Sequence, residues 1–467
     1  MQNIDQVCRA GGREAAIAFS EQYFDDGGFF RDLSALVAVP SESQDPTMSA
    51  YNRAYLDNEI TSLLRPMGFE IKISETRFGD PILTAERTES DDVQTVLIYG
   101  HGDVCDPQRG SWQDGLDPYV LKADGDRYYG RGSADNKAQH LINIKALEAV
   151  LKTKGSLGFN VKILIEMSEE TGSPGLREFV ADNRTALASD VLIASDGPRV
   201  DAGTPTIFLG SRSALNFDLM VTLRDRAYHS GNFGGLISDP AIILIQAIAS
   251  ITDARGQIQI PEWRPDSLTD AVKDVLAVLP PVSDGPPIDV DWGEEALTPS
   301  ERAFGWNSFA VLAIKSGIPD SPQNAISGRA KATCQLRFVV GTDPADILPS
   351  LRRHLDQKGF RQVEIVARKD EAFPATRTEV DGAWVKLVAA SIARTHGKAP
   401  HILPNLAGSI PNDAFSHILG LPTVWVPHSY GGCNQHAPNE HVLGSISRDA
   451  LRNMAGVFWD VGDQAQA

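Results

Sequence analysis

Cysteine is scarce in this chain. Four cysteines occur among 467 residues, and no two of them have the CxxC spacing of a metal clip or a redox pair. This scarcity excludes a fold built on disulfides and favours reduced thiols, as in a cytoplasmic protein. We expect Cys105 and Cys433 to have structural roles, although a thiolate is a good zinc ligand.

Long apolar runs and an excess of basic residues are also missing. No run approaches the roughly 18 apolar residues that cross a membrane. The start, MQNIDQVCRAGGREAAIAF, lacks a basic segment followed by an apolar core. We therefore expect neither a membrane span nor a signal peptide. The 61 acidic and 43 basic residues give a formal net charge of -18, which argues against binding to nucleic acid or to an anionic membrane.

Helical and strand patterns alternate along the first part of the chain. The length of 467 residues predicts two domains. Amphipathic helical patterns are separated by short β-branched apolar runs, which are typical of buried strands in a mostly parallel sheet. Helices are expected at 13–39, 49–69 and 136–152, and strands at 70–75, 81–86, 95–99, 159–167 and 190–196.

Acidic residues or a histidine follow three of these expected strands, and one more acid precedes a helix. They are His101 and Asp103, Glu169 and Glu170, Asp196, and Asp135. In open α/β sheets the chemistry collects at the carboxyl ends of the strands. Neighbouring carboxylates are costly unless a cation compensates them. Each residue alone has an ordinary interpretation, such as a helix N-cap for Asp135, but their recurrence favours a metal site.

From residue 214 the strands alternate apolar and polar residues. Strands are expected at 214–223, 308–315, 329–340 and 360–367, and helices at 240–252 and 343–359. This β-α-β-β-α-β order is that of a split ferredoxin-like unit. An acidic, proline-rich insertion at 253–303 is expected to be a solvated loop with one helix. The α/β pattern then resumes, so we expect a catalytic domain at 1–212 and 373–467 and a second domain at 213–372.

The C-terminal part carries a loop with three histidines. A helix is expected at 383–397, a strand at 421–427 and a closing helix at 446–462. Between the last two lie His428, His436 and His441. His428 directly follows the strand, which leaves a substrate contact open for it, whereas His441 is expected to have no role in a site.

Six short motifs, in their order along the chain, resemble those of the co-catalytic zinc peptidase family. They are GHGDV, GRGSADNK, SEETGS, LIASDG, DRAYHSGNFGG and HAPNEHV. The family includes carnosinase-like dipeptidases, carboxypeptidase G, aminoacylase and succinyl-diaminopimelate desuccinylase. The resemblance implies an α/β fold, with a mostly parallel-sheet catalytic domain and an inserted ferredoxin-like α+β lid domain.

The same resemblance implies a dinuclear metal site. Asp135 would bridge two divalent metal ions, zinc in the first place, with manganese or cobalt as alternatives. His101 and Asp196 would complete one metal site, and Glu170 and His436 the other.

The resemblance also implies roles outside the metal ligands. Asp103 would orient the imidazole of His101, and Glu169 would be the general base. His229 would stabilise the oxyanion from the lid of a partner copy in a homodimer.

Four further residues would contact the substrate. In the lid, these are Asn324 and Arg337, of which Arg337 would take the carboxylate of the substrate. Gly408 and Ser409 match a glycine-rich substrate loop of the family.

Elementary coordination chemistry agrees with this ligand set. Zinc favours histidine nitrogen and carboxylate oxygen, and a catalytic zinc keeps one position open. A bridging carboxylate can hold two cations about 3.5–4 Å apart, so that both act on one carbonyl. The base has to be a group that is not itself a ligand. Glu169 and Glu170 can divide these two tasks, and the residues alone leave open which does which.

We therefore expect a metal-dependent hydrolase of a peptide or amide bond in a small substrate that bears a carboxylate, in the first place a dipeptidase. The alternative is an N-acyl amino acid deacylase or a carboxypeptidase of the same family. A binding protein without catalysis would lack the base or a ligand, and here every position is filled. A nucleotide-binding enzyme would need a phosphate loop after a strand, which GRGSAD does not provide.

Overall fold

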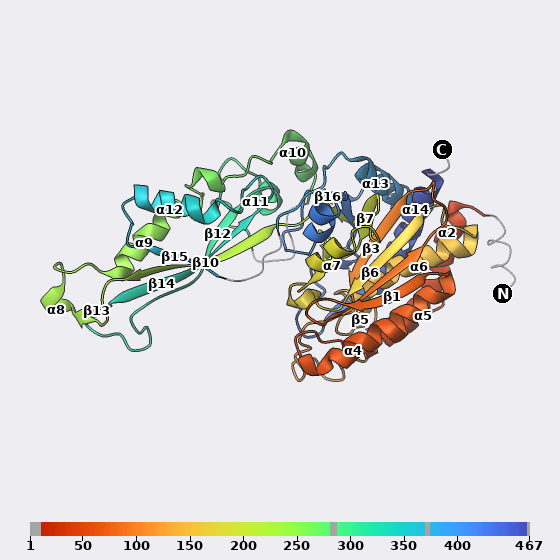
Figure 1. The fold of residues 1–467 in the computed structure, drawn as a ribbon, viewed down its shortest axis with the longest axis horizontal. Coiled ribbons are helices and arrows are strands. Elements are labelled where there is room, and N and C mark those ends of the chain that lie inside the picture. Colours follow the sequence, from red (N-terminus) through yellow and green to blue (C-terminus); the bar gives the residue numbers. More distant parts are fainter. Residues whose placement is uncertain (1–10, 281–286, 369–373, 465–467) are drawn as a thin grey trace. The chain divides into compact units, whose positions relative to one another are not determined.

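The computed structural model describes residues 11–280, 287–368 and 374–464. Within these ranges the chain forms two compact units (Figure 1). The first contains the residues up to Gly210, Arg377–Pro404 and the residues from Pro411 onward. The second contains Ser211–Thr376 and Asn405–Ile410. The short segment Asn405–Ile410, expected in the catalytic domain, thus belongs to the second unit.

An eight-stranded sheet forms the centre of the first unit. In spatial order its strands are β1 (Glu70–Glu75), β2 (Pro81–Arg87), β6 (Asn160–Glu166), β3 (Thr95–His101), β7 (Val191–Ala194), β17 (Thr423–Trp425), β9 (Thr206–Phe208) and β16 (His401–Leu403). The neighbours β6, β3, β7 and β17 are parallel to one another, and β16 is parallel to β9. The strands β1 and β2 are antiparallel at one edge. The mostly parallel sheet expected from the apolar runs is confirmed.

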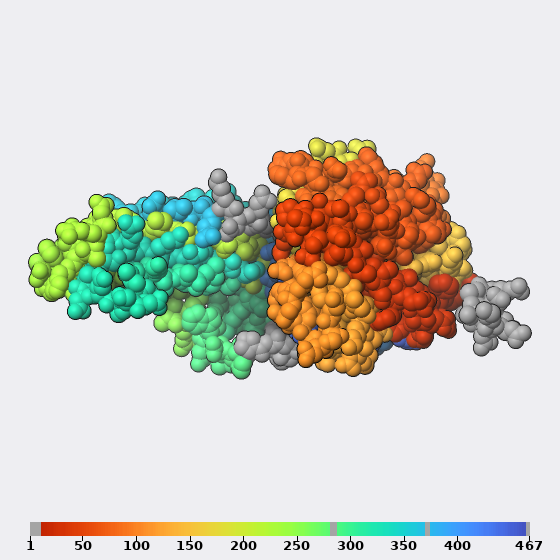
Figure 2. All heavy atoms as spheres, turned by 90° about the horizontal axis from the view of Figure 1, so that it is seen from below, coloured from red at the N-terminus to blue at the C-terminus, as the bar shows by residue number. Residues whose placement is uncertain are grey.

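Helices cover this sheet because its central strands are apolar on both faces. Residues 96–101 of β3 and 163–166 of β6 are all buried, as parallel strands require. The helices α2, α6, α13 and α14 pack against one another, and the N-terminal helices form much of the face that Figure 2 shows in red. The bounds are α2 (Arg13–Asp25), α3 (Gly28–Ala38), α4 (Ser49–Ala54), α5 (Thr61–Leu64), α6 (Lys137–Lys154), α7 (Leu176–Asp182), α13 (Ala383–His396) and α14 (Gly444–Gln464).

Shorter elements complete the first unit. A π-helical turn at Tyr55–Ile60 joins α4 to α5, where one continuous helix was expected. A small antiparallel sheet has the order β19-β5-β4, and β18 pairs with β8. Their bounds are β4 (Lys122–Asp124), β5 (Arg127–Tyr129), β8 (Pro198–Arg199), β18 (Ser429–Tyr430) and β19 (His441–Leu443).

Close packing of α6 on β3 sets the geometry next to His101. A Cβ atom at Gly100 would lie 2.7 Å from the Cβ atom of His140 on α6, so only glycine allows this approach. His140 is buried and its Nε2 atom lies 2.7 Å from the Tyr55 hydroxyl. The start of α6, and with it the preceding Asp135, is therefore held against the end of β3.

The second unit is built on a four-stranded antiparallel sheet. Its order is β12-β14-β10-β15, with β10 (Ser213–Thr222), β12 (Ser308–Ser316), β14 (Arg329–Phe338) and β15 (Glu364–Ala367). The helices α9 (Pro240–Ile251) and α12 (Ile347–Gln357) share a hydrophobic core with this sheet. Along the chain the order is β-α-β-β-α-β, that of the ferredoxin-like unit. The smaller elements are β11 (Tyr228–His229), β13 (Ala325–Ile326), α8 (Ser230–Phe233), α10 (Asp270–Ala277) and α11 (Pro299–Phe304).

The insertion at 253–303 is more than a solvated loop. Ile258, Ile260 and Trp263 are at most 1% exposed and belong to the core of the second unit. The Trp263 indole N–H donates to the Ile347 carbonyl over 3.0 Å. Composition misled the expectation here, since the acidic residues around this segment are exposed but its apolar residues close the core. The expected helix is α10, and α11 is a second one.

None of the helices in the described ranges is both long and apolar enough to cross a membrane.

The substitution Trp263→Ala is expected to lower the free energy of unfolding of the second unit by about 3–5 kcal/mol, because it leaves a cavity in a buried core. Trp292→Ala is the matched control, since Trp292 lies in the same insertion and is 60% exposed. Its effect is expected to stay within about 0.5 kcal/mol. Urea unfolding followed by circular dichroism measures both. Equal effects of the two substitutions would contradict the burial of Trp263.

Candidate metal centre

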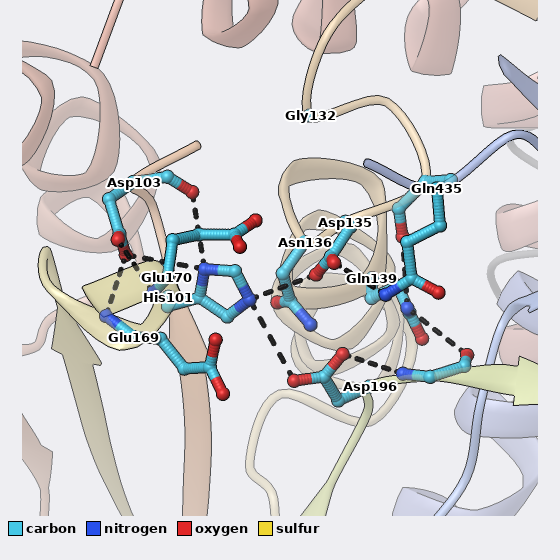
Figure 3. Close-up of polar contacts among 12 residues, drawn as sticks. His101, Asp103, Gly132, Asp135, Asn136, Gln139, Glu169, Glu170, Asp196 and Gln435 are labelled. Carbon is cyan, nitrogen blue, oxygen red and sulfur yellow. Dashed lines mark hydrogen bonds and ion pairs between the residues drawn. The ribbon is translucent and has the colours of Figure 1, made fainter. Parts of the chain in front are cut away.

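Three buried side chains meet at the carboxyl end of the parallel strands. His101 is the last residue of β3, Asp196 follows β7, and Asp135 lies before α6. The His101 Nε2 atom lies 3.0 Å from Asp135 Oδ1 and 3.8 Å from Asp196 Oδ2. Ligand atoms of all three lie within 4.8 Å of one another. Figure 3 shows the His101 ring facing both aspartates, so the first expected ligand set is brought together.

A second cluster shares Asp135 with the first. The Nε2 atom of His436 lies 3.0 Å from Asp135 Oδ2 and 3.1 Å from Glu170 Oε2. Because His101 contacts the other oxygen of Asp135, the two carboxylate oxygens face different histidines. A carboxylate that bridges two cations needs this arrangement.

Cys105 lies beside the second cluster. Its Sγ atom and ligand atoms of Glu170 and His436 all lie within 4.8 Å of one another. The residue is 7% exposed. Burial, followed by the charge of Glu170, raises the pKa of the Cys105 thiol to about 12. The thiol was expected to be structural because both metal sites were full, yet the structure places it next to one of them.

The side chains in these clusters fit divalent cations. Imidazole nitrogens and carboxylate oxygens are the donors that zinc prefers. The Glu170 side chain is 4% exposed, and its Oε1 atom has no hydrogen-bond partner among the described residues. A buried polar atom without a partner costs free energy. A cation bound between Glu170 and His436 would supply the missing partner.

The buried acids raise one another's proton affinity. Burial, and then the charge of Asp135, raise the pKa of Glu170 to about 7 and the pKa of Asp196 to about 6. Burial raises the pKa of Glu169 well above its ordinary value. Hydrogen bonds to Asp135 and Glu170 raise the pKa of His436 to about 11. Protons thus balance the negative charge here, and bound cations can take over that role.

Asp103 fixes both the histidine and the loop that carries the glutamates. Its Oδ1 atom lies 3.3 Å from His101 Nδ1. Its two oxygens also accept hydrogen bonds from the backbone N–H groups of Glu169 (3.2 Å) and Glu170 (3.1 Å). The side chain is fully buried. The His101 Nδ1 atom also lies 3.2 Å from the Asp103 carbonyl, so Asp103 lies where a carboxylate behind a metal-ligating histidine would lie and also holds the backbone of the two glutamates.

Glu440 is a buried residue of the site that the sequence analysis did not identify. Its carboxylate accepts hydrogen bonds from the backbone N–H groups of Gly132 (3.1 Å), Ala134 (2.8 Å) and Asp135 (3.0 Å). Arg131 Nη1 donates to it over 2.6 Å. These bonds tie the loop of Asp135 to the C-terminal loop. Its place inside the HAPNEHV motif was the signal that could have identified it.

The backbone at His436 adopts a conformation that favours glycine. Its φ is 59°, and Asn434 (φ 56°) and Asn439 (φ 62°) lie in the same left-handed region. Such conformations cost free energy for residues with a Cβ atom and concentrate at functional sites. Gln108 Nε2 donates to the His436 carbonyl over 2.8 Å and helps to hold the loop.

The other two histidines of this loop have structural surroundings. His428 is 1% exposed and its Nε2 atom lies 2.9 Å from Ser195 Oγ. His441 is 4% exposed and its Nε2 atom lies 2.7 Å from the Tyr430 hydroxyl. The substrate contact that the sequence left open for His428 is therefore not supported, because its ring is enclosed in the first unit.

Arg337 lies beside a second arginine at one end of the second unit's sheet. It pairs in register with Ser308 of β12, whose Oγ atom accepts a hydrogen bond from Arg212 Nη2 over 2.8 Å. Ser409, next to Gly408, donates to the Arg212 carbonyl over 3.0 Å. Burial, and then the charge of Arg337, lower the pKa of Arg212 to about 10. Arg212 was not predicted, and with Arg337 it makes this end suited to a carboxylate.

His229 and Asn324 lie at the opposite end of the same unit. His229 pairs with Ala325 of β13, which directly follows Asn324. The β11 and β13 pair lies beyond the end of β14 at Arg329 (Figure 1). Arg337 lies eight residues further along β14, about 27 Å away at about 3.4 Å per residue. The predicted substrate contacts of the second unit therefore form two separate groups.

Histidine and carboxylate clusters that share one aspartate, at the strand ends of an α/β sheet, have the arrangement of a two-metal enzyme site. Residues 97–460 match the model of Peptidase family M20/M25/M40, and the chain belongs to this family. The family resemblance in the sequence is thereby confirmed, and the protein is a metallopeptidase by family.

Named relatives agree with this membership. The chain is similar to Beta-Ala-His dipeptidase of Mus musculus, with 35% identity over 70% of each chain. Its match to the Homo sapiens Beta-Ala-His dipeptidase is 36% identical and spans 39% of this chain and 36% of that protein. Among solved structures, an M20 family metallo-carboxypeptidase from Sulfolobus solfataricus has a TM-score of 0.75 and 26% identity. That match covers 93% of this chain and 99% of that one.

The substitution Glu440→Gln is expected to weaken binding of divalent metal by about 10–100-fold, because the amide presents an N–H group to backbone donors and displaces Asp135. Glu89→Gln is the control, since Glu89 also pairs with an arginine, Arg87, over 2.8 Å, but outside the clusters. Isothermal titration with zinc measures both. A Glu440→Gln protein that binds metal like the unaltered chain would exclude this role.

Proposed function

We propose that this protein is a two-metal dipeptidase that hydrolyses the peptide bond of a small substrate with a free carboxylate. The observation that carries the proposal is the position of Asp135, whose two oxygens each lie 3.0 Å from a different histidine, His101 and His436. A shared carboxylate suits two cations that act on one peptide carbonyl. The likeness to Beta-Ala-His dipeptidase supports dipeptides as the substrate class.

The metal ligands divide into two sets in this proposal. His101, Asp135 and Asp196 hold one ion, and Asp135, Glu170 and His436 hold the other. Zinc fits these donors, with manganese or cobalt as alternatives. When bound, the two ions supply Lewis-acid polarisation of the peptide carbonyl and of the attacking water.

Glu169 is the general base. Its neighbour Glu170 contacts His436, whereas Glu169 is in neither ligand cluster found in the described ranges. Figure 3 shows its carboxyl group directed toward the space between His101 and Asp196. From there it takes a proton from the attacking water and later delivers it to the leaving amine.

Two copies of the chain complete one site. An extended dipeptide spans about 7 Å, whereas Arg337 lies about 27 Å along β14 from Arg329, the strand end near the β13 residue that pairs with His229. One substrate therefore cannot contact both residues of the same copy. We place Arg337 of one copy around the substrate together with His229 and Asn324 of the partner copy. Arg337 takes the substrate carboxylate and His229 stabilises the oxyanion.

The second unit has a face that suits such a partner copy. β12 is an edge strand, and a groove between it and α9 is lined by Ile245, Val311 and Ile314. These three side chains are between 41% and 53% exposed. An exposed apolar edge strand readily pairs with another chain. We assign this face to a second copy, because the separation of His229 from Arg337 requires one.

We also propose a reducing, cytoplasmic location. Cys105, Cys334 and Cys433 are all free and buried. Such thiols are ordinary in a reducing compartment.

A carboxypeptidase or N-acyl amino acid deacylase is the second candidate. The likeness to the Sulfolobus solfataricus metallo-carboxypeptidase favours it. The end of the second unit that carries Arg212 and Arg337 suits the carboxylate of any of these substrates. A panel of dipeptides, longer peptides and N-acyl amino acids, each with and without a free carboxylate, distinguishes the candidates by kcat/KM.

The substitution Glu169→Gln is expected to lower kcat by about 10²–10⁴-fold while two metals per chain remain bound, because it removes the base and no ligand. Metal analysis and dipeptide hydrolysis are measured on the same sample. Glu178→Gln is the control, since Glu178 forms a surface ion pair with Arg77. Removing the metals with a chelator is expected to abolish hydrolysis, and adding zinc or manganese to restore it. An unaltered chain that binds no metal would overturn the proposed function.

Mixing His229→Ala with Glu169→Gln protein is expected to restore activity that neither has alone. In a mixed dimer, one site has Glu169 of the first variant and His229 of the second. Random exchange gives about a quarter of the activity of the unaltered enzyme. A mixture that stays inactive while its subunits exchange would exclude the role of His229 across the dimer.

Gel filtration of Ile314→Asp protein tests the face between β12 and α9 separately, with Val278→Asp as an exposed apolar control.

A further inference from the structure

Cys105 has surroundings that do not fit a packing cysteine. A cysteine with a purely structural role behaves as a small apolar side chain among apolar neighbours. The Sγ atom of Cys105 instead lies within 4.8 Å of ligand atoms of two polar side chains, Glu170 and His436. Its sulfur therefore lies within the polar network around the second cluster.

The unpartnered oxygen of Glu170 independently indicates that something binds here. The Glu170 side chain is 4% exposed, its Oε2 atom contacts His436 over 3.1 Å, and its Oε1 atom has no hydrogen-bond partner within the described part of the chain. Sγ of Cys105 lies within 4.8 Å of the ligand atoms of both residues. A nitrogen, an oxygen and a sulfur donor thus surround one small space.

The spacing suits coordination of one cation. With zinc–ligand bonds of about 2.0–2.3 Å, two ligand atoms of a tetrahedral site lie about 3.5 Å apart. Donor atoms within 4.8 Å of one another need side-chain shifts of about 1 Å to reach this spacing. Cys105, Glu170 and His436 are therefore close enough together for their ligand atoms to share one ion after such shifts.

We propose that Cys105 is a sulfur ligand of the metal ion held by Asp135, Glu170 and His436. This inference rests on the proposed two-metal site and deepens it. The thiol proton leaves to solvent when the ion binds, and the thiolate sulfur donates an electron pair to the ion. No oxidation or other bond change is involved.

A sulfur ligand makes the two metal positions chemically different. The cluster of His101, Asp135 and Asp196 offers one nitrogen and carboxylate oxygens, which also suit manganese. The cluster of Cys105, Glu170 and His436 adds sulfur, which favours zinc, cobalt or cadmium over manganese. The second position is thus selective for thiophilic ions, and the first is not.

The test is a cobalt titration of the chelator-treated full-length protein. Visible ligand-field absorption counts bound Co²⁺, and a near-ultraviolet charge-transfer band reports a thiolate on cobalt. We expect two Co²⁺ ions per chain, with the charge-transfer band developing for one of them. We expect Cys105→Ser to lose this band and to bind zinc at least about tenfold more weakly, with manganese binding unchanged.

Matched cysteine variants assign the sulfur. Cys433→Ser and Cys334→Ser remove the two other cysteines of the described ranges, which are also buried, and are expected to keep the band. A variant with Cys8, Cys334 and Cys433 all replaced by serine leaves Cys105 as the single cysteine. This single-cysteine variant tests the role of Cys105 even where Cys105→Ser does not fold, because the proposal requires the variant to keep the charge-transfer band.

The outcomes separate this inference from the proposed function. Two bound Co²⁺ ions without a charge-transfer band, or a band that disappears with Cys433→Ser, would overturn the role of Cys105 and leave the two-metal site standing. A chain that binds no Co²⁺ at all would overturn both. A band that depends on Cys105 alone supports both.

Discussion

Mutual repulsion among buried carboxylates is the constraint on which the first unit depends. Asp103, Asp135, Glu169, Glu170 and Asp196 lie at one end of the sheet (Figure 3), and burial raises the pKa of Glu169, Glu170 and Asp196. Two of these acids, Asp103 and Asp135, are compensated by specific partners. Asp103 accepts backbone N–H groups, and Asp135 lies between two histidines. One oxygen of Glu170 has no hydrogen-bond partner among the described residues, and a bound cation would supply one.

The same constraint explains why residues distant in sequence have to meet. Asp135 and His436 are 301 residues apart, and Glu440 joins their loops through three backbone N–H groups and Arg131. A buried carboxylate with four hydrogen-bond donors is stable only while both loops are in place. Glu440 therefore ties the loop that carries Asp135 to the C-terminal loop that carries His436.

Much of the fold and of the ligand set could be predicted because both follow from local patterns. Apolar β-branched runs predict β3, β6 and β7 since buried parallel strands tolerate few polar residues. Trp263 escaped prediction, because nothing in an acidic, proline-rich segment shows which side chain enters a core. The separation of His229 from Arg337 also escaped it, because a motif gives the order of residues and not their distance along a folded sheet.

The sequence by itself determined which segments form strands, and that histidines and acids follow them, since strand periodicity and residue chemistry are properties of neighbouring residues. Only the tertiary structure decided which of these groups face one another. It enclosed His428 against Ser195, brought the Cys105 sulfur to Glu170 and His436, and made Glu440 the link between two loops. These outcomes depend on how α6 packs on β3 and on where the loops end, and such packing is set by contacts between residues far apart in the chain.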